Sequence, residues 1–154
     1  MAKYISMLAN GGNKIDVSII KTIRNADGTE ESRDNINKFV KQKLGLSDDD
    51  SENLNINQEN LKVVLEGMRS VTEEGTAASI FKDFEIAVGG KTGSAEAPGN
   101  KVNAWFAGFA PFDNPEIAVV VMAENGGHGY YTADAVKQIM REYFGMNLQN
   151  VTED

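Results

Sequence analysis

Four consecutive residues, Lys91-Thr92-Gly93-Ser94, carry the groups that could hold an anion. A lysine ammonium, a threonine hydroxyl and peptide N–H groups all donate hydrogen bonds to a carboxylate, and the same donors can stabilise a developing oxyanion. Glycine lets a peptide-like ligand come close to the backbone, because no Cβ stands in the way. The apolar run Phe84–Gly90 leads into these residues. Together they predict an anion-binding strand edge.

A phosphate-binding loop is an alternative interpretation of the same residues, since its pattern is Gly-x-x-x-x-Gly-Lys-Ser/Thr. Gly90-Lys91-Thr92 supplies only the second half of that pattern, and Glu85 stands where the first glycine belongs. A carboxylate there would repel phosphate. Such a loop must also open a helix, whereas Gly93 and Pro98-Gly99 disfavour a helix interior. We therefore set the nucleotide-binding interpretation aside.

Five blocks of the sequence follow, in order, the pattern of a known family. They are Ala2-Lys3-Tyr4-Ile5 with Leu8 to Gly12; Ile19-Ile20-Lys21 through Asp27-Gly28; Gly67-Met68 with Val71 and Gly75-Thr76-Ala77; Gly90 to Ser94; and Trp105 to Pro111. On these blocks the chain, from residue 1 to about 145, resembles the C-terminal part of a class B penicillin-binding protein transpeptidase domain, one of the penicillin-recognising serine acyltransferases. Residues from about 30 to 56 match poorly and are interpreted as a local insertion, and residues 146–154 as a tail.

The resemblance implies a partial β-lactamase/transpeptidase-like α+β fold. In it, an antiparallel sheet with the motif on an inner strand, followed by a C-terminal hairpin, packs against helices. The resemblance also implies acyl transfer on a peptidoglycan stem peptide, which β-lactams mimic. Lys91 would supply positive charge, Thr92 would bind the terminal carboxylate, Gly93 would allow close approach, and the Ser94 N–H would be one of two oxyanion donors. Stem peptide and β-lactams are thus the expected ligands, with no cofactor and no metal.

The family also needs a Ser-x-x-Lys motif with the nucleophile and a Ser-x-Asn motif. We reject Ser18-Ile19-Ile20-Lys21 because Ser18 lies in a β-branched run predicted as a strand, where residues i and i+3 point to opposite faces. We reject Ser51-Glu52-Asn53 because the acidic run Asp48–Glu52 would oppose an anionic substrate. The nucleophile is expected to be absent from this chain.

The whole chain, residues 1–154, is therefore interpreted as a C-terminal fragment of a serine-type D,D-transpeptidase that is inactive alone. The alternative is a non-catalytic binding or interaction module built on the same subdomain. The parent protein is expected to be membrane-anchored on the extracytoplasmic face of a bacterial cell, and this chain itself to be soluble.

Composition fits one globular unit. The chain has 154 residues, of which 41% are hydrophobic and 25% charged, and no cysteine, which excludes disulfides and thiolate catalysis. A net charge of -8 disfavours nucleic acid or an anionic membrane surface as a partner. No apolar run approaches the about 18 residues of a membrane span. The single histidine, His128, lies in a glycine-rich stretch and is expected in an exposed loop rather than at a metal.

Periodicity predicts the elements that must position the motif. Before it, we expect a helix over residues 4–9 ended by Gly11-Gly12, and then a strand over 17–23 that enters a turn at 25–28. A helix capped by Asp34 and ended by Gly45 should follow, and after it a polar loop over 47–55. The last element before the motif is a helix capped by Asn57, with an apolar face of Leu61, Val64, Leu65, Met68 and Val71. After it, we expect a hairpin of strands 102–111 and 117–124 and a helix over 132–145 with an apolar face of Val136, Ile139, Met140, Tyr143 and Phe144. Trp105, Phe106 and Phe109 are expected in the core of the sheet.

Overall fold

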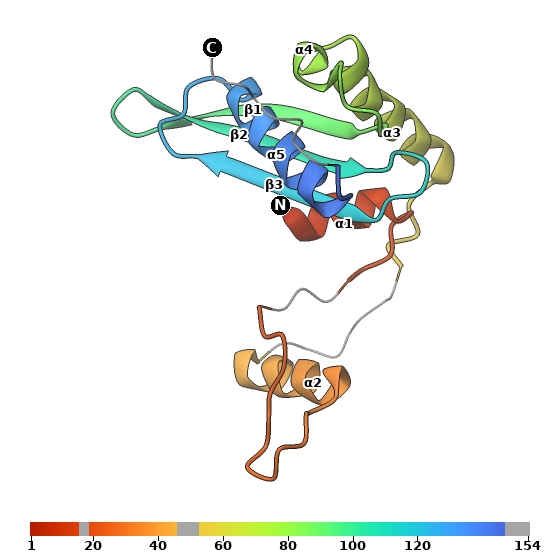
Figure 1. Cartoon of the computed structure of the whole chain (residues 1–154), viewed down its shortest axis with the longest axis vertical. Coiled ribbons are helices and arrows are strands. Elements are labelled where there is room, and N and C mark those ends of the chain that lie inside the picture. Colours follow the sequence, from red (N-terminus) through yellow and green to blue (C-terminus); the bar gives the residue numbers. More distant parts are fainter. Residues whose placement is uncertain (16–18, 46–52, 147–154) are drawn as a thin grey trace.

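A computed structural model of the chain describes residues 1–15, 19–45 and 53–146. Its elements, in chain order, are α1 (Ala2–Ala9), α2 (Arg33–Leu44), α3 (Gln58–Glu73), α4 (Ala78–Phe81), β1 (Gly89–Ala97), β2 (Lys101–Ala110), β3 (Ile117–Ala123) and α5 (Tyr130–Tyr143). The predicted α+β class is confirmed, with helices packed on an antiparallel sheet (Figure 1).

The sheet has the order β1-β2-β3, and both pairs of strands are antiparallel. The register of β1 on β2 runs without interruption from Gly89 opposite Phe109 to Ala97 opposite Lys101. The motif residues therefore lie on a strand, as predicted, and β2 and β3 form the predicted C-terminal hairpin. β1 is an edge strand rather than an inner one among the described residues, because β2 is the only described strand that pairs with it.

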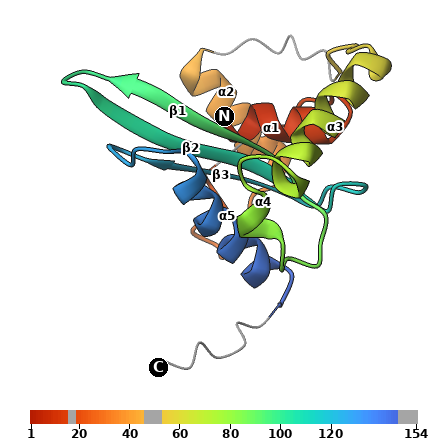
Figure 2. The same cartoon turned by 90° about the horizontal axis from the view of Figure 1, so that it is seen from above.

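Each face of the sheet carries its own core, because successive side chains along a strand point to opposite sides. On one face, Phe109 of β2 packs with Ile5 of α1 and Met68 of α3. On the other face, Phe106 packs with Phe81 of α4 and Val136 of α5. Figure 2 shows the sheet between α5 on one side and α1 on the other. Burying a side chain of this size contributes about 1.5–3 kcal/mol to folding, so the two rings of β2 hold the layers together.

Residues 19–45 form a lobe around α2 that projects away from the sheet in Figure 1. Within the described part of the chain, α2 contacts none of the other helices or strands. At the root of the lobe, Asn53 Nδ2 donates to Asn13 Oδ1 at 2.6 Å, although the two residues are 40 positions apart. The Leu54 N–H adds a bond of 3.0 Å to the Gly12 carbonyl. The two ends of this excursion are thus held side by side.

The predicted strand over 17–23 is wrong for its described residues, because 19–23 form neither strand nor helix. Val17 and Ser18 lie outside the described residues. A β-branched run needs a partner strand to form a ladder, and the side chain of Ile19 is fully exposed instead. The predicted turn that follows is present: the Asn25 N–H donates to the Thr29 carbonyl at 2.8 Å, and Gly28 has a φ of 87°.

Helix α2 begins two residues earlier than predicted. Ser32, rather than Asp34, caps it, because the Ser32 side chain accepts a hydrogen bond from the Asn35 N–H at 3.2 Å. Asp34 lies in the first turn, where a carboxylate favours the helix dipole. Gly45 ends the helix in the left-handed conformation, as predicted. Most of the polar loop predicted over 47–55 lies outside the described residues.

The cap of α3 is confirmed, since Asn57 Oδ1 accepts from the N–H groups of Glu59 and Asn60 at 2.9 and 3.1 Å. Leu61 and Met68 are buried, but Val64 is 48% exposed and does not join the core. Helix α5 likewise buries only part of its predicted face. Ile139 and Tyr143 are exposed, and Lys137 takes a buried place beside Val136 and Met140.

Lys137 can be buried because its ammonium finds two acceptors. Its Nζ donates to the Ile80 carbonyl at 2.7 Å and to Asp83 at 2.6 Å, and Arg141 binds the other oxygen of Asp83 at 2.8 Å. The hydrogen bond from Lys137 is the main cause that lowers the pKa of Asp83 from 3.8 to about 2. These contacts tie α5 to α4 and to Asp83, which follows α4.

We predict that Asp83→Asn lowers the free energy of unfolding at pH 7 by about 1–2 kcal/mol, because it replaces the carboxylate partner of the nearly buried Lys137 ammonium by a neutral amide. The gap between the two proteins should narrow as the pH falls from about 4 towards about 2, because a carboxyl with a lowered folded-state pKa loses its contribution there. Urea denaturation measures both effects. Glu66→Gln is the control, since Glu66 lies 3.8 Å from Lys62 in an exposed pair; equal losses in the two variants would contradict the prediction.

Candidate functional site

The four motif residues occupy the middle of β1 and divide between the two faces of the sheet. Lys91 and Gly93 lie on the face that α1 and α3 cover, opposite Ala107 and Trp105 of β2. Thr92 and Ser94 alternate with them. Because β1 is an edge strand, every second residue of the run also presents its N–H and C=O to the side of the strand that lacks a strand partner.

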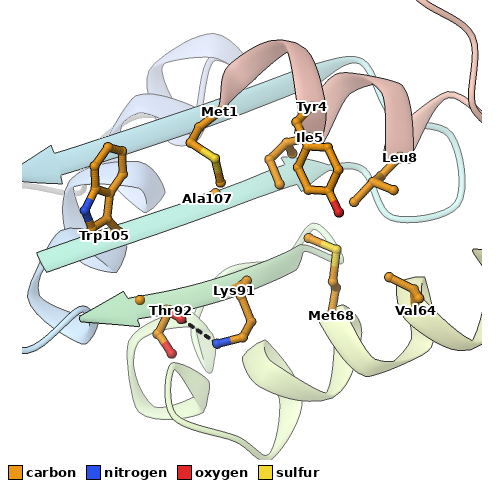
Figure 3. Close-up of a pocket in the computed structure, with 11 residues that line it drawn as sticks. Met1, Tyr4, Ile5, Leu8, Val64, Met68, Lys91, Thr92, Trp105 and Ala107 are labelled. Atoms are coloured by element: carbon orange, nitrogen blue, oxygen red, sulfur yellow. Dashed lines mark hydrogen bonds between the residues drawn. The ribbon is translucent and has the colours of Figure 1, made fainter. Parts of the chain in front are cut away.

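A cavity of about 240 Å³ lies beside the motif, between α1, α3 and the sheet (Figure 3). Its walls are almost wholly apolar, apart from the motif itself. They come from Met1, Tyr4, Ile5 and Leu8, from Val64 and Met68, and from Lys91, Thr92, Gly93, Trp105 and Ala107. Among these, Met1, Tyr4 and Val64 are largely exposed, so the cavity is open at the rim. An apolar hollow with a few polar groups at one side is the usual form of a ligand site.

Lys91 folds back along its own strand. Its Nζ donates to the Thr92 carbonyl at 2.5 Å, the contact drawn in Figure 3. In the described ranges Lys91 takes part in no ion pair, and its side chain is exposed. An ammonium held only by a neutral carbonyl is available to an incoming anion.

The other motif side chains have partners from distant segments. Thr92 Oγ1 lies 3.0 Å from Thr76 Oγ1, which comes from the turn between α3 and α4. Ser94 Oγ accepts a hydrogen bond from the Gly129 N–H, at 3.3 Å, at the start of α5. The site is therefore assembled from β1, the end of α3 and the beginning of α5.

The N-terminal end of β1 is fixed by α3. The Thr72 hydroxyl donates to the Val88 carbonyl at 2.5 Å, and Arg69 donates to the same oxygen at 3.3 Å. Arg69 is itself held by an ion pair of 2.7 Å with Glu73. The entry of the chain into the motif strand is thus set by polar side chains of α3, of which Thr72 is buried.

Two glycines let the aromatic rings of β2 pack directly on β1. A Cβ on Gly89 would lie 2.5 Å from the Phe109 ring, and one on Gly90 would lie 2.4 Å from the Phe106 ring. Both rings are fully buried. Any side chain at either glycine would push β1 away from β2, and the motif would move with it.

Trp105 is not in the core, contrary to the sequence prediction, whereas Phe106 and Phe109 are. The indole is half-buried and lines the cavity opposite Gly93. It lies on the same face as Phe109, but towards the end of the sheet that α1 leaves open. Thr76 and the cavity residues of α1 and α3 were missed by sequence reasoning, although Thr76 stands in one of the matched blocks.

The rejected motif candidates are only partly described. Ser18 and Ser51 lie outside the described residues, so their exclusion stays a prediction. Lys21 is exposed in the segment that forms no strand, and Asn53 binds Asn13 at the root of the lobe; neither lines the cavity beside Lys91. His128 is exposed in the loop before α5, as expected.

The described ranges 1–15, 19–45 and 53–146 offer neither a metal site nor a membrane-spanning helix. They contain no group of three or more histidine, aspartate or glutamate side chains placed to hold a metal ion. None of their helices has the length and apolar character needed to cross a membrane. The acidic run Asp48–Glu52 lies outside these ranges.

Comparison with known proteins gives one consistent match. Residues 1–145 match the family model of the penicillin binding protein transpeptidase domain. The chain is 31% identical over 132 residues to penicillin-binding protein H of Bacillus subtilis, covering 79% of this chain and 17% of that protein. It is 32% identical over 103 residues to the peptidoglycan D,D-transpeptidase MrdA of Haemophilus influenzae, covering 55% of this chain and 16% of that protein. The chain thus spans about a sixth of the length of these relatives.

Solved structures of penicillin-binding proteins and D,D-transpeptidases match the fold as well. The crystal structure of Pseudomonas aeruginosa PBP2 in complex with WCK 5153 aligns with a TM-score of 0.73 and 30% identity, over 96% of this chain and 30% of that one. The D,D-transpeptidase domain of a peptidoglycan glycosyltransferase from Eggerthella lenta aligns with a TM-score of 0.69; at 24% identity, this match concerns the fold alone.

We predict that Gly129→Ala displaces the motif strand, because a Cβ there would lie 2.4 Å from the Gly93 carbonyl oxygen and 2.7 Å from that of Trp105. Overpacking of this kind costs about 1–3 kcal/mol of folding free energy. The matched control is Gly67→Ala, on α3, where a Cβ meets nothing and should stabilise the helix by about 0.5–1 kcal/mol. Denaturation curves and the amide NMR shifts of Gly93 and Trp105 measure the outcome. Unchanged shifts in Gly129→Ala would show that α5 does not support the motif.

Proposed function

Because this chain belongs to the penicillin binding protein transpeptidase domain family, we propose that it is the C-terminal portion of a peptidoglycan D,D-transpeptidase. On this proposal its task is to supply the strand that binds the terminal carboxylate of a stem peptide or of a β-lactam. The observation that carries the proposal is the position of Lys91 and Thr92 on an edge strand beside an open cavity.

The carboxylate is bound by charge and by a hydroxyl. Lys91 exchanges its contact with the Thr92 carbonyl for the incoming carboxylate, and the Thr92 hydroxyl donates a second hydrogen bond. Gly93, which lines the cavity, leaves room for the peptide to lie along the strand. A charge-assisted pair of this type contributes more than a neutral hydrogen bond, and the apolar walls beside it strengthen the attraction by lowering the local dielectric.

The Ser94 N–H is the proposed oxyanion donor. By the alternation of the ladder, Ser94 presents its backbone to the same side of β1 as Thr92 does. Its side chain is turned to the Gly129 N–H, so the role assigned here belongs to the backbone and not to the hydroxyl. A fixed N–H aimed at the carbonyl oxygen stabilises the negative charge that develops when the carbonyl is attacked.

We propose that the nucleophilic serine comes from polypeptide that precedes this part of the domain. Its hydroxyl attacks the penultimate D-Ala carbonyl, the bond to the terminal D-Ala breaks and that residue leaves with a proton, and a neighbouring stem amine then takes the acyl group and releases the serine. In support, this chain corresponds to 30% of the solved PBP2 chain that it matches. The exposed apolar rim formed by Met1, Tyr4 and Val64 is where we place the rest of the domain. We further propose that the parent is anchored on the outer face of a bacterial membrane.

We predict that a fluorescent penicillin forms no covalent adduct with this chain alone, because on this proposal the activated serine belongs to another part of the domain. Mass spectrometry after incubation tests this. A stable adduct on Ser18 would overturn the fragment interpretation. Adding the upstream part of the domain from the same reading frame should restore labelling; if the reading frame contains no such part, the chain is a non-catalytic module instead.

We predict that this chain binds a peptide ending in D-Ala-D-Ala as the free acid but not as the C-terminal amide. Thr92→Val should weaken binding of the acid roughly tenfold, since it removes one hydrogen bond to a charged group. Thr29→Val is the matched control, because Thr29 bonds to Asp27 in the turn of the α2 lobe, away from the cavity. NMR titration of the amides of residues 91–94 gives the affinities. Equal binding of acid and amide would refute the carboxylate role.

A further inference from the structure

A second hydroxyl lies against the residue that we expect to bind the carboxylate. Thr76 Oγ1 is 3.0 Å from Thr92 Oγ1, and either oxygen could donate the proton. The two residues are 16 positions apart and come from different elements. We propose that Thr76 is a positioning residue, which orients the Thr92 hydroxyl so that its proton points at the ligand carboxylate. This inference rests on the proposed role of Thr92.

The number of protons on the two hydroxyls determines which of them donates when a carboxylate is bound. A threonine hydroxyl has one proton to donate and two lone pairs that accept. A carboxylate only accepts hydrogen bonds, so the Thr92 hydroxyl must donate its proton to the ligand. Thr76 must then donate to Thr92, and a hydroxyl that accepts one bond while donating another becomes a better donor. If Thr92 donated to Thr76 instead, its lone pairs would face the carboxylate and repel it.

The backbone around Thr76 is firmly held, although its side chain is exposed. The N–H groups of Glu74 and Gly75 both donate to the Ser70 carbonyl, at 3.0 and 2.8 Å. On the other side, the N–H of Ala77 donates to the Val71 carbonyl at 3.0 Å, and Ala77 is fully buried. The turn that presents Thr76 is thus anchored at both ends.

Gly75 makes this turn possible. A Cβ there would lie 2.9 Å from the Val71 Cα and 3.1 Å from the Ser70 carbonyl oxygen, so the chain folds back on α3 more tightly than a larger residue allows. The turn places Thr76 at the edge of β1, beside Thr92. In the part of the chain that the structure describes, Thr76 is the only partner of the Thr92 hydroxyl.

The test uses the full chain and two readouts. The first is the χ1 rotamer of Thr92 without ligand, from three-bond NMR couplings of its methyl carbon. The second is the affinity for a D-Ala-D-Ala peptide as the acid and as the amide. Thr76→Val keeps the shape of the side chain and removes the hydroxyl, Thr76→Ser keeps the hydroxyl, and Thr29→Val is again the remote control.

In Thr76→Val, we expect the Thr92 rotamer to average and the affinity for the acid to fall about three- to tenfold, the worth of one neutral hydrogen bond. Thr76→Ser should restore both, and Thr29→Val should change neither. A fixed Thr92 rotamer with unchanged affinity in Thr76→Val would overturn the inference. If Thr92→Val still weakened binding in that case, the proposed function would stand without it. If Thr92→Val had no effect, both would fail. Should Thr76→Val not fold, Thr76→Ala carries the same expectations.

Discussion

The close contact between the backbone of β1 and two phenylalanine rings is the constraint on which the site depends. Phe106 and Phe109 lie on opposite faces of the sheet, and each occupies space that a Cβ on Gly90 or Gly89 would take. Packing at this density leaves β1 one position relative to β2. Because the motif begins at the next residue, the two rings set the height at which Lys91 and Thr92 reach the edge of the sheet.

Elements outside β1 also hold the motif residues in place. Helix α3 binds the Val88 carbonyl through Thr72 and Arg69, and the turn at its end brings Thr76 to Thr92. The beginning of α5 contributes the Gly129 N–H to Ser94. Two of the groups in these bonds, the Val88 carbonyl and the Gly129 N–H, belong to the backbone, and the others are short or anchored side chains on α3, on β1 and in the turn after α3. A site supported in this way keeps its donors aligned before a ligand arrives, which is what oxyanion and carboxylate binding require.

The sequence predicted well where a local signal decides the structure. Asn57 caps α3 and Gly45 ends α2 because these residues act on their own helix, and the strand that carries the motif follows from its apolar lead and its glycines. Prediction failed where distant partners decide. Residues 19–23 have strand-like composition but no strand beside them, and Lys137 is buried because Ile80 and Asp83 receive its ammonium. The contact of Thr76 with Thr92 joins segments that no periodicity connects, so only the structure reveals it.

The hydrogen bond between Asn13 and Asn53, a clamp at the root of the α2 lobe, lets the length and sequence of the lobe vary more than those of the rest of the chain. Since the clamp already closes the excursion, and α2 touches no other helix or strand in the described ranges, a descendant could lengthen, shorten or exchange the segment without repacking the sheet. Doubling the length of a closed loop costs only about 0.6 kcal/mol in chain entropy. Homologues are therefore free to diverge at this position while the strand that carries Lys91–Ser94 stays unaltered.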